Sequence, residues 1–322
     1  MRAIIHERFG SPPEVLQVHD VEKPAPGAHE VLVRVKAAAV AKGDWLMTNS
    51  VPYIARPMFG IRRPKRRIAG LEFAGVVEQT GPGADGVGPG DPVFGWVDGG
   101  ALAEFVIVPE TQMTAKPVSI SFEQAAAIPM SGLAGYEAVA AAGDVAGKQV
   151  LITGASGGVG SFAVQVAKAA GAEVTGVASG RNRDFVLGLG ADHFIDYTTE
   201  EITEGGRRYD VVIDIAGNRS VSQLRRALTP KGAAVLVGGE GGNVTMGYGR
   251  TIRAVLVSPF ISQQLTGLMS KPSRRNLEAL AALIDSGDLT PQVGATYPLE
   301  RAGDAVESVG AGRSHGKTVV TV

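Results

Sequence analysis

A glycine-rich turn is the part of this sequence whose residue types and spacing point most directly to chemistry. In the stretch VLITGASGGVGSFAVQVAK, the spacing G-x-G-x-x-G is present with alanine in its first place. The turn follows an apolar run and opens a helical segment, which is the context in which this motif binds a dinucleotide. Glycines let the backbone approach a pyrophosphate and let the helix pack on the strand, while the helix N-terminus offers free N–H groups. A tight turn without a ligand is the alternative. The residues predicted to bind the cofactor here are Ala155, Ser156, Gly157, Gly158, Val159 and Gly160.

The next apolar run, EVTGV, ends in the stretch ASGRNRD. An NAD-selective site has an Asp or Glu about 20 residues past the glycines, where it accepts hydrogen bonds from the ribose. Here the place is taken by Ser179, whose hydroxyl can donate to a 2′-phosphate, and Arg181 or Arg183 can pair with that phosphate. Asp184 is better placed in the first turn of the following helix. The pattern predicts NADP(H), and the alternative is that both arginines are solvated residues at a helix start.

Apolar runs alternate with helical segments between residues 123 and 259, which predicts a doubly wound parallel sheet around this turn. Before residue 122, short β-branched runs separated by Gly- and Pro-rich turns predict an antiparallel barrel or sandwich. After residue 260 an amphipathic helix, RRNLEALAALIDSG, precedes a last strand, KTVVTV, which we expect to return to the β-rich domain. The fold class is therefore α/β with a second, β-rich domain. The predicted domains are residues 1–122 with 260–322, and residues 123–259.

Composition excludes several classes of site. The 322 residues include no cysteine, so disulfides, thiolate nucleophiles and cysteine-rich zinc sites are ruled out. A net charge of −1 gives no overall field that would favour nucleic acid or an anionic membrane. No apolar run is long enough for a signal peptide or a membrane span, so we expect a cytoplasmic protein. The basic segment RRPKRR, residues 62–67, is either a solvated loop or lies near an anionic cofactor or substrate.

With a dinucleotide turn in its middle and a β-rich domain from both its ends, the chain resembles a zinc-independent medium-chain dehydrogenase/reductase of the quinone oxidoreductase (zeta-crystallin-like) type. GKQVLITGASGGVGSFAVQVAK carries the resemblance best, and AGLEFAGVV, GGALAEFVIVP, LGADHFIDY and GKTVVTV fall where the family has similar segments. The zinc-dependent branch has Gly-His-Glu where this chain has Gly70-Leu71-Glu72, and the five histidines are scattered without ligand spacing. The resemblance implies a Rossmann-type domain, a GroES-like domain, no metal, and a homodimer paired through an edge strand near AAVLVGG.

The activity implied by the resemblance is hydride transfer between NADP(H) and a quinone or an α,β-unsaturated carbonyl. The substrate cleft would be lined by residues 39–53 and capped near residues 131–135. This chain departs from the family because Ala41 and Ala134 stand where Asn and Thr are usual. Lys42, Asp44 and Tyr53 are the candidates to supply a catalytic donor instead. The alternatives for them are a solvated lysine, a turn-capping aspartate and a tyrosine of the core or rim.

Further cofactor contacts are also implied by the resemblance, with Tyr197 near the adenosine phosphate and Lys317 near the nicotinamide. Asn218 has helix capping as its alternative. Two other functions stay open: an NADPH-binding protein of low turnover with a structural or sensing role, and an enoyl-thioester reductase. We expect a small-molecule substrate and neither nucleic acid nor membrane as partner. The remaining predicted contacts are Ser131, Gly238 and Gly239.

Overall fold

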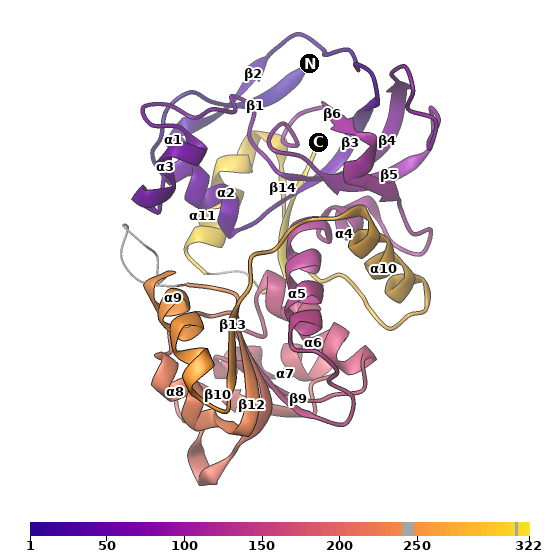
Figure 1. The fold of residues 1–322 in the computed structure, drawn as a ribbon. Helices are drawn as coiled ribbons and strands as arrows, with labels where there is room; N and C mark the ends of the chain where they lie inside the picture. The colour runs from indigo at the N-terminus through magenta and orange to yellow at the C-terminus, as the bar shows by residue number, and fades with distance from the viewer. Residues whose placement is uncertain (240–247, 313–314) are drawn as a thin grey trace. The chain divides into compact units, whose positions relative to one another are not determined.

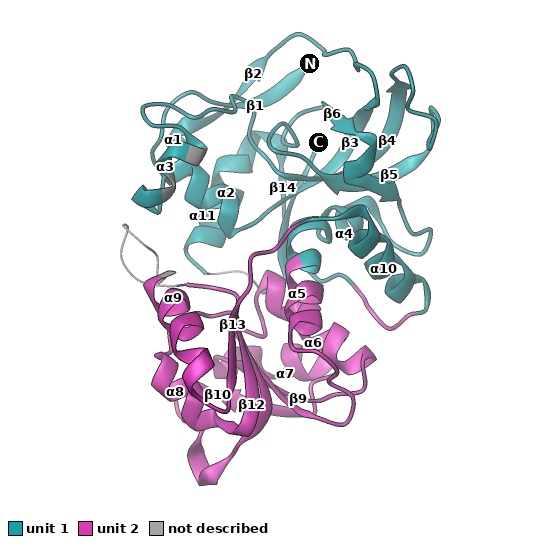
Figure 2. Cartoon of the chain, viewed as in Figure 1, with its two compact units in different colours: residues 1–133, 272–286, 291–322 teal, residues 134–271, 287–290 magenta. Residues whose placement is uncertain are grey.

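The computed structural model describes residues 1–239, 248–312 and 315–322 (Figure 1). This described part of the chain forms two compact units (Figure 2). Unit 1 comprises residues 1–133, 272–286 and 291–322, and unit 2 comprises residues 134–271 and 287–290. The first two unit boundaries, at 133/134 and 271/272, fall later in the chain than the predicted domain boundaries at 122/123 and 259/260.

Unit 2 contains a parallel sheet with the strand order β10-β9-β8-β11-β12-β13. The chain builds outward from β8 in one direction and from β11 in the other, so the gap between the carboxyl ends of these two strands is the topological switch point at which such sheets bind ligands. The strands are β8 (Gln149–Thr153), β9 (Glu173–Ala178), β10 (His193–Asp196), β11 (Tyr209–Asp214), β12 (Leu228–Leu236) and β13 (Gln264–Gly267).

Helices cover both faces of this sheet, with α5 and α6 on one side and α8 and α9 on the other (Figure 1). The predicted doubly wound architecture is therefore confirmed. Helix α8 is shorter than the predicted segment SVSQLRRALTPKG, because Pro230 lacks the N–H that a helix interior needs and the chain turns into β12 instead. The helices are α5 (Pro129–Ala141), α6 (Gly158–Ala169), α7 (Arg183–Gly188), α8 (Val221–Ala227) and α9 (Tyr248–Val257).

Unit 1 is built on a largely antiparallel sheet with the order β14-β15-β3-β4-β5-β7, and β6 also pairs with β3. The last strand, β15, pairs antiparallel with β3, Val319 opposite Ala39, so the C-terminal segment does return to the β-rich unit as predicted. The strands of the sheet are β3 (Glu30–Val40), β4 (Glu72–Thr80), β5 (Pro92–Trp96), β6 (Phe105–Pro109), β7 (Met113–Ala115), β14 (Val293–Pro298) and β15 (Lys317–Thr321).

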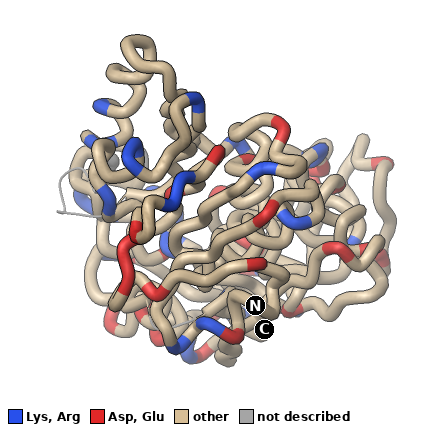
Figure 3. Tube along the Cα trace, turned by 90° about the horizontal axis from the view of Figure 1, so that it is seen from below, with Lys and Arg blue, Asp and Glu red and all other residues tan. Residues whose placement is uncertain are grey.

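Short helices and a hairpin of β1 (Arg2–His6) and β2 (Leu16–Asp20) complete unit 1 around a core that includes Val33, Phe73, Leu102 and Val320. Acidic and basic residues are interspersed along the trace (Figure 3). No helix within the described ranges combines the length and the apolar character needed to cross a membrane. The helices of unit 1 are α1 (Pro12–Val15), α2 (Lys42–Asn49), α3 (Arg56–Phe59), α4 (Phe122–Ala126), α10 (Arg274–Asp285) and α11 (Ala302–Gly310).

Candidate functional site

The glycine-rich turn joins β8 to α6 at the carboxyl edge of the sheet in unit 2. Gly154 has a φ of +69°, a conformation that favours glycine, so this residue makes the tight turn. Ala155, which takes the first place of the G-x-G-x-x-G spacing, is fully buried. A Cβ on Gly160 would lie 2.1 Å from the Gly154 carbonyl oxygen, so that only glycine fits there. At Gly157 a Cβ would meet the same oxygen at 3.4 Å, an ordinary contact. Packing within the chain therefore does not require glycine at 157, and its bare backbone fits the close approach of a phosphate.

The N-terminus of α6 supplies the other feature that a dinucleotide phosphate needs. Gly157 is its N-cap, and the helix begins at Gly158 and continues for 12 residues. The first N–H groups of a helix have no partner one turn earlier and carry partial positive charge. Ser156, Gly158 and Val159 are only half-buried, so their backbone is reachable from solvent. The turn thus fits the diphosphate of a nicotinamide dinucleotide.

The stretch ASGRNRD begins as a 3-10 turn, Gly180–Asn182, and continues as α7, with Asp184 in the first helical turn as predicted. The two arginines differ in their surroundings. Both are exposed, but the guanidinium carbon of Arg183 lies 5.5 Å from the centre of the Phe194 ring, a cation–π contact, and no such ring contact is found for Arg181 in the described residues. Arg181 is therefore the better placed of the two to pair with a phosphate beside Ser179.

Two polar residues that we did not single out from the sequence hold this stretch in place. The side-chain amide of Asn182 donates to the hydroxyl oxygens of Ser156 and Ser179, at 3.1 Å in each case. Asp196, at the end of β10, accepts hydrogen bonds from Thr198 and from the backbone of Gly180. These hydrogen bonds lower the pKa of the Asp196 carboxyl, and the bond from the Thr198 hydroxyl contributes most. The sequence could have indicated a role for Asp196, because this acid lies at the end of a predicted strand.

Tyr197 follows Asp196 directly, is about half exposed, and donates its backbone N–H to the Ala178 carbonyl at 3.2 Å. It therefore lies next to the strand end that carries Ser179. Asn218 is exposed in the loop after β11. The helix-capping alternative for Asn218 is wrong, because the hydroxyl of Ser220 caps α8.

Gly238 and Gly239 follow β12 at the same edge of the sheet. A Cβ on Gly238 would lie 2.0 Å from the Ile215 carbonyl oxygen, so the loops after β11 and β12 approach each other closely. Arg250, from α9, joins these loops by donating to the carbonyls of Gly238 at 2.7 Å and of Arg219 at 2.8 Å. The loops at this end of the sheet are thus tied to one another through their backbones.

Arg250 also forms an ion pair with the fully buried Asp214, which accepts a second hydrogen bond from Thr153 at 2.7 Å. Thr153 ends β8 and Asp214 ends β11, so their bond spans the switch point. A buried aspartate at the end of an apolar strand requires a partner. This requirement could have indicated from the sequence that Asp214 has a buried partner, but it does not identify Arg250 as that partner.

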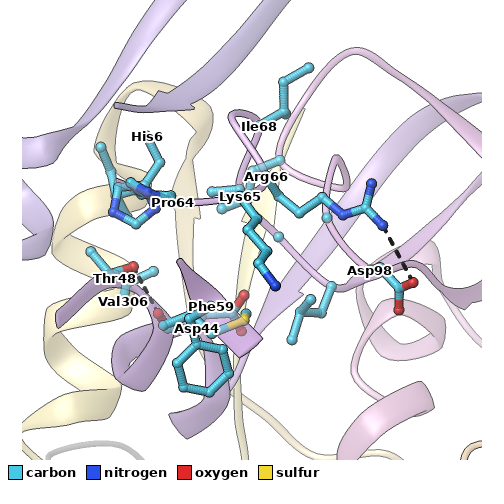
Figure 4. A pocket seen from close by; sticks show the side chains of 17 residues that line it. His6, Asp44, Thr48, Phe59, Pro64, Lys65, Arg66, Ile68, Asp98 and Val306 are labelled. Atoms are coloured by element: carbon cyan, nitrogen blue, oxygen red, sulfur yellow. Dashed lines mark hydrogen bonds and ion pairs between the residues drawn. The ribbon is translucent and has the colours of Figure 1, made fainter. Parts of the chain in front are cut away.

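Unit 1 contains a cavity of about 560 Å³ (Figure 4). This volume lies within the range of ordinary ligand sites. Three residues of the basic segment 62–67 line it, namely Pro64, Lys65 and Arg66, and Arg66 pairs with the exposed carboxylate of Asp98 at 3.7 Å. The basic residues of the segment are exposed, and a role for them near an anionic ligand stays a prediction. Most of the remaining wall is apolar and includes Met47, Phe59, Ile68, Leu71, Leu102 and Val306.

Asp44, on α2, is the acidic group buried in the wall of this cavity, and only 4% of it is exposed. Its Oδ2 accepts the backbone N–H of Ala41 at 2.8 Å, so that one oxygen does cap the start of α2. Its Oδ1 has no hydrogen-bond partner in the described part of the chain. Burial raises the pKa of Asp44 to about 7, with a smaller contribution from the charge of Glu72, and the charge of Lys317 acts in the opposite direction. Near neutral pH this carboxyl can therefore carry a proton.

His6, one of the five histidines without ligand spacing, is a second buried polar group of the same wall. It is 5% exposed, and its Nε2 has no hydrogen-bond partner among the described residues. Its ring contacts Phe9 edge-on, with 5.9 Å between ring centres. Burial lowers the pKa of His6, so the imidazole is neutral near pH 7.

The other two candidate donors lie elsewhere. The amine of Lys42 donates to the carbonyl of Gly310 at 2.8 Å, at the end of α11, and lies 4.4 Å from the centre of the Trp45 ring. Tyr53 is 45% exposed, with the guanidinium carbon of Arg56 4.3 Å from its ring centre. Neither Lys42 nor Tyr53 lines the cavity. Of the three predicted donors, Asp44 alone does so in the described residues.

Ser131 and Lys317, both predicted to contact the cofactor, are brought together in unit 1. Lys317 is 2% exposed and donates to Glu72 Oε1 at 2.6 Å and to Ser131 Oγ at 3.2 Å. Glu72 is fully buried and its other oxygen accepts the backbone N–H of Met130 at 2.9 Å. In this geometry Lys317 is the counter-ion of a buried carboxylate, and its contact with a cofactor stays a prediction.

No three His, Asp or Glu side chains in the described ranges lie close enough together to hold a metal ion. Leu71, which occupies the place of the family's histidine ligand, contributes an apolar side chain to the cavity wall. The absence of a zinc requirement stays a prediction that rests on residue identities.

Comparison with known proteins places the chain. Residues 27–118 match the alcohol dehydrogenase GroES-like domain, and residues 189–320 match a family described as zinc-binding dehydrogenase. The chain is 30% identical to the chloroplastic quinone-oxidoreductase homolog of Spinacia oleracea, with 99% of this chain and 98% of that protein covered. It is 32% identical to the mitochondrial NAD(P)H oxidoreductase RTN4IP1 of Mus musculus, over 91% of this chain and 82% of that protein.

Among solved structures, the quinone oxidoreductase from Coxiella burnetii superposes with a TM-score of 0.87 at 28% identity, covering 100% of this chain and 99% of that one. The GroES-like and Rossmann-type parts expected from the resemblance are thus both found. The relatives are oxidoreductases, and the turn at the carboxyl edge of the sheet fits the nicotinamide cofactor named for one of them. The chain belongs to the medium-chain dehydrogenase/reductase family, as an oxidoreductase of the quinone oxidoreductase type with a nicotinamide cofactor.

Proposed function

We propose that this protein is an NADPH-dependent reductase of quinones or α,β-unsaturated carbonyls that works without a metal, and that the acceptor binds in the cavity of unit 1. The observation that carries the proposal is the buried Oδ1 of Asp44, a group able to hold a proton at a cavity wall and without a partner in the described chain. A buried polar group is satisfied in the functional complex, and a ligand oxygen would satisfy this one.

The residues that would hold the cofactor are the turn at 154–160, the strand end at Ser179, and Arg181. When bound, the reduced nicotinamide supplies a hydride, which adds two electrons to the acceptor. Negative charge then accumulates on the acceptor oxygen. Asp44, protonated on Oδ1, donates its hydrogen bond and then its proton to that oxygen, which completes the addition of one hydride and one proton. The neutral imidazole of His6 offers a second hydrogen-bonding group to the acceptor.

The preference for NADPH over NADH is supported by the hydroxyl of Ser179 and by the exposed guanidinium of Arg181. We expect NADPH to bind more than about tenfold more tightly, or ~1.4 kcal/mol. Tryptophan quenching on titration with each cofactor measures this difference. Arg181→Ala should abolish most of it, whereas Arg183→Ala should change it less because that guanidinium rests on Phe194. Equal affinities in the unmodified protein would refute the cofactor assignment.

The catalytic proposal is tested by following NADPH consumption with a naphthoquinone, an unbranched enal and an enoyl thioester. Asp44→Asn keeps the side-chain shape but cannot supply a proton, and should lower kcat about 100-fold, since general acid catalysis typically contributes 10²–10⁴-fold. Asp20→Asn makes the same chemical change at an exposed carboxyl of unit 1 that does not line the cavity, and should leave kcat within about threefold. Unchanged turnover in Asp44→Asn would refute the role of this acid.

The same panel separates the remaining alternatives. Tight NADPH binding without turnover on any acceptor would support a cofactor-binding protein of low turnover. Turnover confined to the thioester would support an enoyl-thioester reductase, for which Lys65 and Arg66 at the cavity offer partners to an anionic carrier. Steady consumption with quinone or enal supports the function proposed here.

We further propose a homodimer formed through unit 2, but with a different edge strand from the one expected. The strand near AAVLVGG is β12, which is paired on both sides, so its prediction as an edge was wrong. Next to β12, the edge strand in the described residues is β13, and beside it α9 exposes Ile252 and Leu256 at 62% and 66%. Leu256→Glu should convert a dimer to a monomer in light scattering, and a monomeric unmodified protein would refute this proposal.

A further inference from the structure

Asn182 occupies the junction of the two segments that would surround the adenosine end of the cofactor. It ends the 3-10 turn Gly180–Asn182, and its side-chain nitrogen lies 3.1 Å from Ser156 Oγ and 3.1 Å from Ser179 Oγ. Ser156 belongs to the phosphate turn, 26 residues earlier, and Ser179 to the end of β9. One amide group therefore connects the phosphate turn with the strand end that reads the ribose.

The direction of these two hydrogen bonds determines what the serines can offer a ligand. An amide nitrogen is only a donor, so each serine oxygen accepts from Asn182. A hydroxyl that accepts in this way keeps its own hydrogen to donate elsewhere. Asn182 thus uses its two hydrogens to leave two O–H donors, one on Ser156 and one on Ser179, available on neighbouring segments. Two such donors beside the exposed Arg181 suit an anion.

The turn that carries Asn182 is also fixed from the other side. Asp196 accepts hydrogen bonds from the Thr198 hydroxyl at 2.7 Å and from the Thr198 backbone at 3.0 Å, in addition to the Gly180 backbone. A Cβ on Gly180 would lie 2.3 Å from the Asp196 carboxylate, so the glycine lets the turn come this close. The acceptor capacity of this acid is thus directed to the protein and not to ribose hydroxyls.

We propose that Asn182 is a positioning residue for NADPH selectivity, because it holds Ser156 and Ser179 as a pair of hydroxyl donors to the 2′-phosphate. This inference rests on the proposed preference for NADPH. It deepens that proposal by assigning the selectivity to a side chain that need not touch the cofactor.

Asn182→Asp is the sharpest test, because it preserves shape but replaces the donor with an acceptor. The carboxylate would take the hydrogens of both serines and add a negative charge beside the phosphate. We expect the Kd for NADPH to rise about 100-fold or more, since two hydrogen bonds to a charged group are lost. The Kd for NADH should stay within about threefold. Asn182→Ala removes the hydrogen bonds that orient the two serine hydroxyls without adding charge. It should lower the affinity for NADPH about tenfold and the affinity for NADH only slightly.

The matched control is Gln223→Glu, the same amide-to-carboxylate change in unit 2, at a helix start where the side-chain oxygen still accepts from the Ser220 N–H. It should leave both affinities within about threefold. Ser156→Ala combined with Asn182→Ala should weaken NADPH by less than the two single losses together, because one acts through the other.

The outcomes separate the inference from the proposal beneath it. The positioning role is overturned if both Asn182 variants lower the affinities for NADPH and NADH equally, or lower neither affinity, while the unmodified protein still prefers NADPH. In that case the cofactor assignment stands. If the unmodified protein binds both dinucleotides equally, the cofactor assignment fails and the inference with it. Thermal unfolding of each variant without cofactor shows whether the fold is retained, and an NADPH-specific loss in a folded variant supports the inference.

Discussion

The buried carboxyl of Asp44 should make the free energy of unfolding depend on pH in a direction opposite to that of most carboxyls. Its pKa is raised from 3.8 to about 7, chiefly by burial. Between these two values the unfolded chain releases the proton while the folded chain keeps it. The unfolded state therefore binds fewer protons, and the stability contributed by this residue is full below pH 3.8 and decreases as pH rises to 7. Above pH 7 both states are ionised and the contribution is constant.

The size of the effect follows from the two pKa values. A difference of about three units corresponds to about 4 kcal/mol, at roughly 1.4 kcal/mol for each unit. About 2 kcal/mol of this falls between pH 5 and pH 7. Asp44→Asn removes the titration but keeps an oxygen that can accept from the Ala41 N–H. The variant should therefore gain stability relative to the unmodified protein as pH rises.

Urea unfolding at pH 5, 6, 7 and 8 measures the difference between variant and unmodified protein at each pH. We expect that difference to grow by about 2 kcal/mol from pH 5 to pH 7 and to level off by pH 8. Asp98→Asn is the control, because its side chain is 77% exposed and solvent screens its charge. Parallel curves for Asp44→Asn and the unmodified protein across this range would show that the carboxyl is not buried as described.

Two further predictions concern backbone space and buried charge. Gly160→Ala should reduce the melting temperature and abolish cofactor binding, because its Cβ would lie 2.1 Å from a backbone oxygen. Gly157→Ala should keep the melting temperature and weaken only cofactor binding. Equal melting temperatures for the two variants in differential scanning fluorimetry would contradict this. Lys317→Met leaves the fully buried Glu72 without its counter-ion and should cost about 3–5 kcal/mol of unfolding free energy in urea titration. Adding Glu72→Gln should restore most of that loss, and an additive further loss would argue against the ion pair.

The sequence was sufficient to predict the features that depend on local pattern. Glycine spacing after an apolar run placed the phosphate turn, and the alternation of strands and helices predicted the doubly wound sheet. The return of the last strand followed from its lack of any later partner, and β15 does pair with β3. Asp44 was among the predicted donors because it belongs to the segment 39–53 that was expected to line the substrate cleft, and it lines the cavity.

The features that the sequence did not predict depend on contacts between distant segments. Asn182 acts across 26 residues and Arg250 across 36, and neither belongs to a recognisable motif. His6 differs from an ordinary surface histidine only because the wall of unit 1 buries its side chain. Strand β13 is four residues long, QLTG, with one buried apolar side chain, so its composition gave no sign that it covers β12.

The division of unit 1 along the chain has a consequence for synthesis. Unit 2 is nearly continuous, so it can fold while the C-terminal residues are still being translated, since domains generally fold as units from the N-terminal side. Unit 1 cannot, because β15 must cover the edge of β3 at residues 37–40 and Lys317 must reach Glu72, 245 residues away. Until β15 has been synthesised, the nascent chain therefore carries an open strand edge and an unpaired acid. Unit 1 is thus the later of the two units to complete its sheet, and the open edge is a site at which nascent chains can aggregate.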